Sequence, residues 1–255
     1  MILELDMGNT RIKWRLRHEL DIIARGHLPS QSAWSALAAS ITATLKTARP
    51  DFDLSLCLHQ LRVVSVLDEA RTEDFQTWCF STYGINAEFA ASQPAAAGVI
   101  NGYETPEQLG ADRWLAILAA YEQVKHAVVV VDCGSALTVD LVAACGKHLG
   151  GYIGPGLTAM RNALLSGTQK VHLSDAPIDF TTAPGRNTGT AVAAALRAMM
   201  IGLIKEAVQE LAVHGEEPAL ILTGGDAGLL QPFFSNAVFN PELVLDGLVL
   251  AVPIK

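Results

Sequence analysis

The sequence predicts an α/β protein whose two lobes are built on one plan, and two similar hairpins and a third glycine turn carry this prediction. Each hairpin has an apolar strand that ends in Asp-x-Gly, followed by a segment in which apolar and polar residues alternate. Period-two alternation is typical of a strand and not of a helix. Because both copies share this pattern, we expect one lobe around each hairpin, with the hairpins facing each other across a cleft.

The first hairpin lies within residues 1–18. An apolar run from Met1 to Leu5 leads into the turn Asp6–Thr10, after which Ile12, Trp14 and Leu16 alternate with basic residues. A dinucleotide-binding fingerprint needs a glycine-rich turn that opens a helix. Here a single glycine joins two strands, so the sequence excludes that kind of nucleotide site.

The second hairpin has the strand Val128–Val131, the turn Asp132–Ser135 and an alternating strand that ends near Leu141. In such a turn glycine lets the backbone approach a ligand, and successive N–H groups with a Ser, Thr or Asn side chain point at an anion. The carboxylate can hold a cation beside the phosphates. Either hairpin alone also fits an ordinary tight turn, but the same Asp offset in both favours phosphate binding.

The third glycine turn, Thr223–Asp226, follows the apolar strand Ala219–Leu222 and precedes an apolar helix start. Glycines there let a flat base or a ribose lie close to the backbone. A strand-to-helix corner with two glycines is also a common plain connection. The turn therefore predicts an adenosine site only in combination with the two hairpins.

Composition and charge exclude some partners. The formal net charge is −8 and the pI is about 5.3. No stretch gathers the Lys and Arg residues that phosphate neutralisation requires, so we do not expect a nucleic-acid partner. Charged residues make up 17% of the chain, below the typical fraction of about 25%. This deficit suggests apolar surface that is hidden in a subunit interface.

We expect a cytoplasmic protein with no membrane segment. Glu4 and Asp6 stand where a secretion signal would carry positive charge. The longest stretch without a charged residue, Gly26–Leu45, is broken by Pro29 and contains many polar residues. The four cysteines lack C-x-x-C spacing, so we interpret them as reduced thiols. Cys133 is expected to be a small apolar filler and not a nucleophile.

Six motifs in order resemble type III pantothenate kinases, which belong to the acetate and sugar kinase, heat-shock 70 and actin superfamily. These motifs are Asp6-x-Gly8-Asn9-Thr10-x-x-Lys13, Asn101-x-Tyr103, Gly110-Ala111-Asp112-Arg113, Asp132-x-Gly134-Ser135-Ala136, Gly150-Gly151-x-Ile153-x-Pro155-Gly156 and Gly185-Arg186-Asn187-Thr188. The resemblance implies two ribonuclease H-like lobes of actin-like (ASKHA) architecture with a nucleotide cleft between them. The expected lobes are residues 1–115, with the first phosphate hairpin, and 116–255, with the second hairpin and the adenosine corner.

The resemblance also implies the activity, which is ATP-dependent phosphorylation of pantothenate to 4′-phosphopantothenate, the first step of coenzyme A biosynthesis. It assigns ATP binding to Asp6, Met7, Gly8, Asn9, Thr10, Arg11, Ile12, Lys13 and Ser135, and pantothenate binding to Tyr103, Gly110, Ala111, Asp112, Arg113 and Thr188. Asp112 matches the proton acceptor, and Asp132 matches the position of a monovalent cation, K⁺ or NH₄⁺. The resemblance also implies that Mg²⁺ accompanies ATP. The family usually has Thr where this chain has Ser135, which keeps the hydroxyl.

The residues themselves support these roles and leave alternatives open. Asp112, between Gly110 and Arg113, suits a base that accepts a hydroxyl proton, but it also fits the favourable first turn of a helix. Lys13 could neutralise phosphate or be solvated. Thr188 could be an N-cap, a role that Asn187 could also fill. Tyr103 could be an ordinary half-buried tyrosine.

Three functions compete: the pantothenate kinase, another phosphoryl-transfer enzyme of the superfamily, and a non-catalytic regulatory protein. Fold alone does not separate them. The Gly110–Arg113 string favours the first over the second, and the presence of Asp6, Asp112 and Asp132 together disfavours the third. The resemblance further implies a homodimer. The helix expected over Ala191–Ala207 agrees with it, because its apolar surface exceeds the stripe that one lobe's core would cover.

Overall fold

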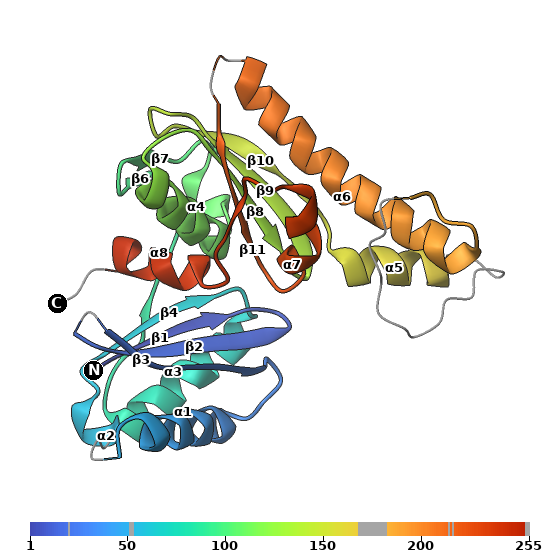
Figure 1. The fold of residues 1–255 in the computed structure, drawn as a ribbon. Helices are drawn as coiled ribbons and strands as arrows, with labels where there is room; N and C mark the ends of the chain where they lie inside the picture. Colours follow the sequence, from blue (N-terminus) through green and yellow to red (C-terminus); the bar gives the residue numbers. More distant parts are fainter. Residues whose placement is uncertain (20, 51–53, 168–182, 214, 216, 253–255) are drawn as a thin grey trace. The chain divides into compact units, whose positions relative to one another are not determined.

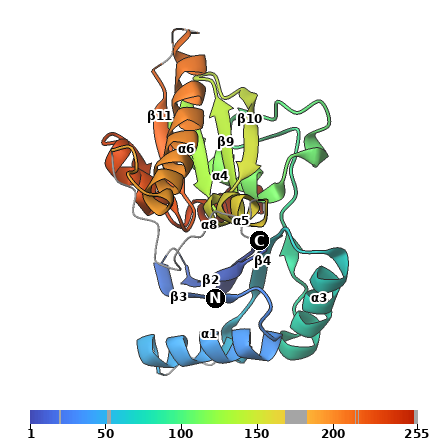
Figure 2. The same ribbon diagram turned by 90° about the vertical axis from the view of Figure 1, so that its right-hand side faces the viewer.

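The structure is a computed structural model that describes residues 1–255 apart from 20, 51–53, 168–182, 214, 216 and 253–255. The described chain forms two compact units, each drawn in Figures 1 and 2. Unit 1 consists of Met1–Ala97, Thr105–Ala119 and the C-terminal segment from Val244. Unit 2 consists of Gly98–Glu104 and Ala120–Leu243. The division into residues 1–115 and 116–255 stays a prediction about domains.

Unit 1 is built on a five-stranded sheet with the order β3-β2-β1-β4-β5. Its strands are β1 (Ile2–Met7), β2 (Arg11–His18), β3 (Asp21–Pro29), β4 (Gln60–Ser65) and β5 (Glu88–Phe89). The β1–β2 and β2–β3 pairs are antiparallel, whereas β1–β4 and β4–β5 are parallel. The predicted first hairpin is therefore β1–β2, with Asp6 opposite Lys13.

One face of this sheet carries the apolar core of unit 1. Leu3 and Leu5 of β1 point to the face where Leu37 of helix α1 (Trp34–Ala48) and Phe75 of helix α3 (Glu69–Tyr83) pack. Figure 2 shows both helices on the same side of the sheet. The short helix α2 (Leu54–Cys57) lies between them in the sequence. Asp68 caps α3 by accepting a hydrogen bond from Arg71 N–H at 2.8 Å, a common way to satisfy a helix N-terminus.

Unit 2 repeats the plan, which confirms the α/β fold of two similar lobes. Its sheet has the order β10-β9-β8-β11-β12, again with two antiparallel pairs followed by two parallel ones. The strands are β8 (Val128–Cys133), β9 (Ala136–Val142), β10 (His148–Pro155), β11 (Ala219–Thr223) and β12 (Val238–Phe239). The position of each strand in its sheet matches that of its counterpart in unit 1, so β8–β9 corresponds to β1–β2.

The remaining elements connect these strands or cover them. They are β6 (Ala95–Ala96), β7 (Val99–Ile100), a 3₁₀ turn at Pro106–Gln108, α4 (Ala111–Val124), α5 (Leu157–Ser166), α6 (Thr188–Val213), α7 (Ala227–Leu230), a 3₁₀ turn at Gln231–Phe233 and α8 (Leu243–Ala251). None of the described helices has the length and apolar composition that crossing a lipid bilayer requires.

Helix α6 buries only a narrow stripe. Leu196, Met200, Ile204, Ala207 and Leu211 recur at spacings of three and four residues and pack on the core of unit 2. This spacing places them on one side of the helix. The other sides are also largely apolar, and the side chain of Met199 is 54% exposed. The helix is therefore more apolar than its packing against the described residues of unit 2 requires.

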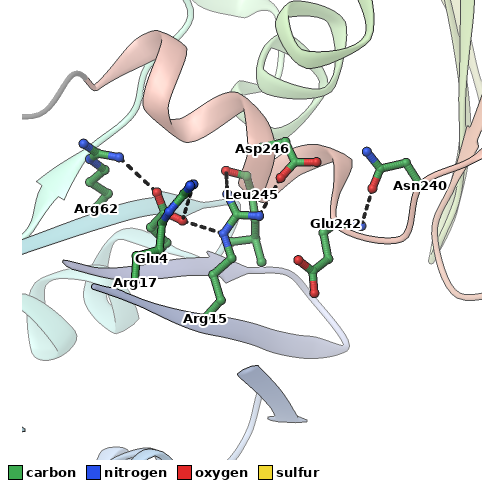
Figure 3. Close-up of polar contacts among 8 residues, drawn as sticks. All are labelled: Glu4, Arg15, Arg17, Arg62, Asn240, Glu242, Leu245 and Asp246. Carbon is green, nitrogen blue, oxygen red and sulfur yellow. Dashed lines mark hydrogen bonds and ion pairs between the residues drawn. The ribbon is translucent and has the colours of Figure 1, made fainter. Parts of the chain in front are cut away.

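The second face of the unit 1 sheet contains a buried charge network (Figure 3). The carboxylate of Glu4 on β1 accepts from Arg15 Nε at 2.5 Å and from Arg62 Nη1 at 3.0 Å. Arg17 Nη1 lies 3.9 Å from the same carboxylate. Glu4, Arg15 and Arg62 are fully buried. Because buried charges are costly unless they are paired, these side chains stabilise the sheet only as a set.

Helix α8 completes this network. Arg15 Nη1 lies 2.5 Å from Asp246 Oδ1, and Arg15 Nη2 donates to the Leu245 carbonyl at 2.8 Å. Burial by itself lowers the pKa of Arg15, but the carboxylates of Glu4 and Asp246 outweigh burial and raise it. The guanidinium is therefore permanently charged.

Candidate active site

The first hairpin turn is held by main-chain and serine contacts. Gly8 N–H donates to the Arg11 carbonyl at 3.0 Å and closes the turn. Ser30, just after β3, donates from its hydroxyl to the Asn9 carbonyl at 2.6 Å and from its N–H to the Thr10 carbonyl at 3.0 Å. These bonds use main-chain carbonyl groups of the turn, so they fix its backbone. The side chains of Asn9, Thr10 and Arg11 are exposed.

The predicted ATP residues of this hairpin differ in what they can offer a ligand. Met7 and Ile12 are fully buried in the core of unit 1, so they have only main-chain groups to contribute. Asp6 and Lys13 are half-buried, and they face each other across the strands at the end next to the turn. Asp6 shares its face of the sheet with Glu4, two residues earlier. The hairpin therefore carries the carboxylate of Asp6 and the ammonium group of Lys13 beside a turn whose backbone is held by hydrogen bonds.

The second hairpin turn meets the third glycine turn within unit 2. Asp226 N–H donates to the Cys133 carbonyl at 2.9 Å, and Gly156 N–H donates to the Ser135 carbonyl at 3.1 Å. Gly224 has φ +93°, and a Cβ there would overlap Asp132 Oδ1 and the Cys133 carbonyl. Only glycine combines that backbone conformation with so close an approach. The structure thus brings the predicted phosphate turn and the predicted adenosine corner together, with Ser135 exposed at the tip.

Asp132 lies beside two threonines. It pairs with Thr138 on β9 and with Thr223 on β11, so the three side chains share one face of the sheet. Thr223 is buried, and its hydroxyl has no hydrogen-bond partner among the residues that the structure describes. Within the part of the chain that the structure describes, no three His, Cys, Asp or Glu side chains form a metal-binding group. One carboxylate with hydroxyl oxygens fits a weakly held cation that prefers oxygen ligands.

Cys133, the neighbour of Asp132, is a buried thiol. Burial raises its pKa to about 12, and the nearby carboxylates of Asp132 and Asp226 add to the effect. Because the thiolate and not the thiol is the nucleophile, this side chain is suited to packing. All four cysteines of the chain are free.

Asp112 lies in the first turn of α4, in unit 1. Trp114 N–H donates to the Gly110 carbonyl at 2.9 Å, and Asp112 Oδ1 accepts from Arg113 N–H at 2.8 Å. A Cβ at Gly110 would lie 2.7 Å from Asp112 Oδ1, so a larger residue at this position would require the carboxylate to move. Arg113 is buried and Asp112 is half-buried. Asp112 therefore lies in the first turn of a helix, as one of the two interpretations expected. Its carboxylate is still partly accessible there, at the positive end of the helix dipole.

The remaining predicted substrate residues, Tyr103 and Thr188, lie in unit 2. Tyr103 N–H donates to Asn101 Oδ1 at 3.0 Å, and the half-buried tyrosine ring stacks on His148 with 6.0 Å between centroids. Thr188 is exposed at the start of α6 and lines an open cavity of ≈ 1150 Å³.

Asn187, and not Thr188, is the N-cap of α6. Its Oδ1 accepts from Thr190 N–H at 2.9 Å, and Thr190 Oγ1 accepts from Asn187 N–H at 3.2 Å. This reciprocal pair satisfies both donors. The hydroxyl of Thr188 is therefore not used as the cap.

The sequence matches the family model of type III pantothenate kinases over residues 2–210. The chain belongs to the type III pantothenate kinase family. A type III pantothenate kinase of Pseudomonas aeruginosa is 38% identical over the full length of both chains. One from Pseudomonas putida is 37% identical, also over the full length of both. A third, from Cellvibrio japonicus, is 36% identical over 97% of this chain and 95% of its own.

Two solved structures have a fold similar to that of this chain. A Campylobacter jejuni protein described as a conserved putative Baf family transcriptional activator has a TM-score of 0.60 at 22% identity, over 96% of this chain and 94% of its own. Spiroplasma citri MreB 5 bound to AMPPNP has a TM-score of 0.53 at 8% identity, over 96% of this chain and 94% of its own. At these identities the likeness shows the actin-like fold alone.

Proposed function

We propose that this chain phosphorylates pantothenate with ATP to give 4′-phosphopantothenate, the first step of coenzyme A biosynthesis. The observation that carries the proposal is Asp112 at the start of α4, flanked by Gly110 and Arg113, in a chain that matches a member of the family along that member's whole length. Phosphoryl transfer depends mainly on positioning and charge neutralisation. A half-buried carboxylate at a helix N-terminus is a suitable acceptor for a hydroxyl proton.

In this proposal the turn of each hairpin offers groups that bind phosphates of ATP. N–H groups of the residue 8–11 turn and the ammonium of Lys13 neutralise phosphate oxygens, and the Ser135 hydroxyl makes a second contact. The primary hydroxyl of pantothenate attacks the γ-phosphorus as the bond to ADP breaks, and the hydroxyl proton passes to Asp112. Arg113 and Gly110 shape the acceptor side of the site, because arginine binds anionic oxygens in a bidentate manner.

We further propose that Mg²⁺ accompanies ATP and that K⁺ or NH₄⁺ binds at Asp132. The buried Thr223 hydroxyl, which has no hydrogen-bond partner among the described residues, supports the second part, since its oxygen would serve as a ligand of an ion beside Asp132. A bound cation there supplies positive charge next to the second phosphate turn.

We also propose that the active form is a cytoplasmic homodimer. The open cavity of ≈ 1150 Å³ lies between α5 and α6 in unit 2, and its walls are mostly apolar. Leu164, Val192, Ala195, Met199 and Leu203 are among the lining residues, and Thr188 is another. A large exposed apolar surface is typical of an interaction site. A second copy that covers this face would enclose Thr188 and complete the pantothenate pocket.

A coupled assay of ADP release tests the activity. Purified protein with Mg-ATP and potassium should turn over pantothenate much faster than acetate, glycerol or a panel of sugars. Equal rates on all acceptors would favour another phosphoryl-transfer enzyme of the superfamily. No ADP release above the background of the Asp112→Asn variant would favour the regulatory alternative.

A further inference from the structure

Unit 2 contains a buried histidine that sequence reasoning did not single out. His148 is the first residue of β10, and its side chain is fully buried. Its Nε2 lies 3.0 Å from Oδ1 of Asp140 on β9, which is 2% exposed. The register of β9 and β10 shifts between His148 and Gly150, so Leu149 is an extra residue in the pairing. Such bulges redirect side chains and are frequent near active sites.

The segment that carries Tyr103 lies against this histidine. Ile100 N–H donates to the Gly146 carbonyl at 2.9 Å, and Ile100 forms a parallel bridge with Lys147. Two residues further on, Gly102 N–H points at His148 Nδ1 at 3.4 Å. A Cβ at Gly102 would overlap the His148 carbonyl oxygen. The backbone at Gly102 thus lies as close to His148 as a glycine allows.

The ring of His148 also supports Tyr103 directly. The two rings are nearly parallel, with 13° between their planes and 6.0 Å between centroids. Any rotation of the imidazole would therefore change both the hydrogen bond to Gly102 and the surface on which Tyr103 rests. Asp140 opposes such a rotation, because it holds the far edge of the ring from the neighbouring strand.

These contacts define the protonation of the ring. A backbone N–H can only donate, so Nδ1 must be the acceptor for Gly102. The ring proton then lies on Nε2 and is donated to the Asp140 carboxylate. A carboxylate that orients an imidazole in this way fixes both its tautomer and its angle.

We infer that His148 is a positioning residue for the substrate loop Asn101–Tyr103, held in its Nε2–H tautomer by Asp140. This rests on the proposed function, in which Tyr103 contacts pantothenate. His148 does not touch the substrate. It sets the place of the Gly102 backbone and of the Tyr103 ring, and therefore the fit of the acceptor and not the binding of ATP.

The test compares two substitutions that each keep one polar contact. In His148→Asn the amide oxygen can take the place of Nδ1 and accept from Gly102. In His148→Gln the longer side chain can reach Asp140 but leaves Gly102 N–H without an acceptor. Both lose the ring, so the stacking loss is common to both. Lys147→Ala is the control, because Lys147 is exposed and its bridge to Ile100 uses only the main chain.

We expect His148→Gln to raise the KM for pantothenate about tenfold, the effect of losing one hydrogen bond and a stacking surface. His148→Asn should raise it clearly less, with the KM for ATP unchanged within about twofold in both variants. Lys147→Ala should behave like the wild type. Equal pantothenate KM values for the two histidine variants, or a matching rise in the KM for ATP, would overturn the inference.

A measurement on the unaltered protein covers the case in which a variant does not fold. Nitrogen-15 NMR of histidine-labelled protein should show His148 with a protonated Nε2 and an unprotonated Nδ1. A proton on Nδ1 would overturn the inference whatever the variants do. If the wild type does not phosphorylate pantothenate at all, the proposed function fails. The role of His148 is then judged separately: it stands if the wild-type ring carries its proton on Nε2 and if His148→Gln loses the contacts to the loop Asn101–Tyr103.

Discussion

Arg15 and Asp246 stand 231 positions apart in the sequence, yet Arg15 Nη1 lies 2.5 Å from Asp246 Oδ1 (Figure 3). The guanidinium also holds Glu4 on the opposite side through Nε. Arg15, on the second strand of the first hairpin, thus joins Glu4 of β1 to Asp246 of helix α8. Glu4 lies two residues before Asp6, so the charge network begins immediately behind the proposed ATP site.

Glu4→Gln should lower the free energy of unfolding of unit 1 by about 3–5 kcal/mol, because it leaves Arg15 and Arg62 buried without their shared counter-charge. All four tryptophans, Trp14, Trp34, Trp78 and Trp114, lie in unit 1, so intrinsic fluorescence in urea reports its unfolding. Glu73→Gln is the matched control. Glu73 is an exposed residue of α3 in the same unit, so its neutralisation should cost less than about 1 kcal/mol. Similar losses in both variants would contradict the role of the network.

The buried thiols give a second prediction. Burial raises the pKa of Cys79 and of Cys133 to about 12. At pH 8 only about 10⁻⁴ of each is then thiolate, the form that reacts with iodoacetamide. Cys145 is exposed and should be alkylated first, with Cys79 and Cys133 labelled only in urea. Mass spectrometry of digested protein measures this, and rapid labelling of Cys133 in the folded protein would contradict its packing role.

The sequence predicts the repeated hairpins well because glycine turns and period-two alternation are local signals. It also predicts that α6 is too apolar for one lobe. Arg15 shows where local signals end. Its alternation with apolar residues looks like a solvated strand face, whereas that face is buried and the counter-charges of Arg15 come from Glu4 and Asp246.

His148 and the first hundred residues show the same limit. Residues 18–100 carry no motif, yet they form β3 to β5 and α1 to α3 of unit 1. The contacts of His148 depend on a bulge at Leu149 and on the loop at Gly102, 46 positions earlier. A single histidine in the sequence predicts neither feature. The position of Asn187 four residues before the apolar helical pattern that starts at Ala191, with Thr190 three residues after Asn187, was the signal that could identify the cap of α6.

Asp112→Asn should lower turnover by about 10² to 10⁴ while ATP binding stays nearly intact, the usual effect of removing a positioned base. The amide keeps the size of the side chain and can still accept from Arg113 N–H. Glu107→Gln, in the exposed 3₁₀ turn just before α4, controls for a general loss of charge and should be fully active. Near-normal turnover of folded Asp112→Asn would exclude this carboxylate as the base.

Activity should require Mg²⁺ and rise strongly with potassium or ammonium, with sodium a poor substitute. Asp132→Ala should abolish the potassium response. Thr223→Val removes the buried hydroxyl without changing the shape of the side chain, so it should weaken the response, whereas Thr223→Ser should retain it. Titrations of rate against each chloride salt at constant ionic strength measure the effect. An unchanged potassium response in Asp132→Ala would exclude the cation site.

The chain should sediment at twice its 27.1 kDa mass at micromolar concentration, because the apolar face of α6 needs a partner. Obligate two-fold interfaces bury on the order of 2,000 Å² or more and place the same surface on both copies. Met199→Glu puts a charge on this face, where desolvation is costly, and should dissociate the dimer. Val213→Glu is the control, because Val213 is 75% exposed on the same helix and does not line the cavity. Since Thr188 lines that cavity, the Met199→Glu monomer should also bind pantothenate more weakly. A single species near 27.1 kDa with full activity would refute the dimer.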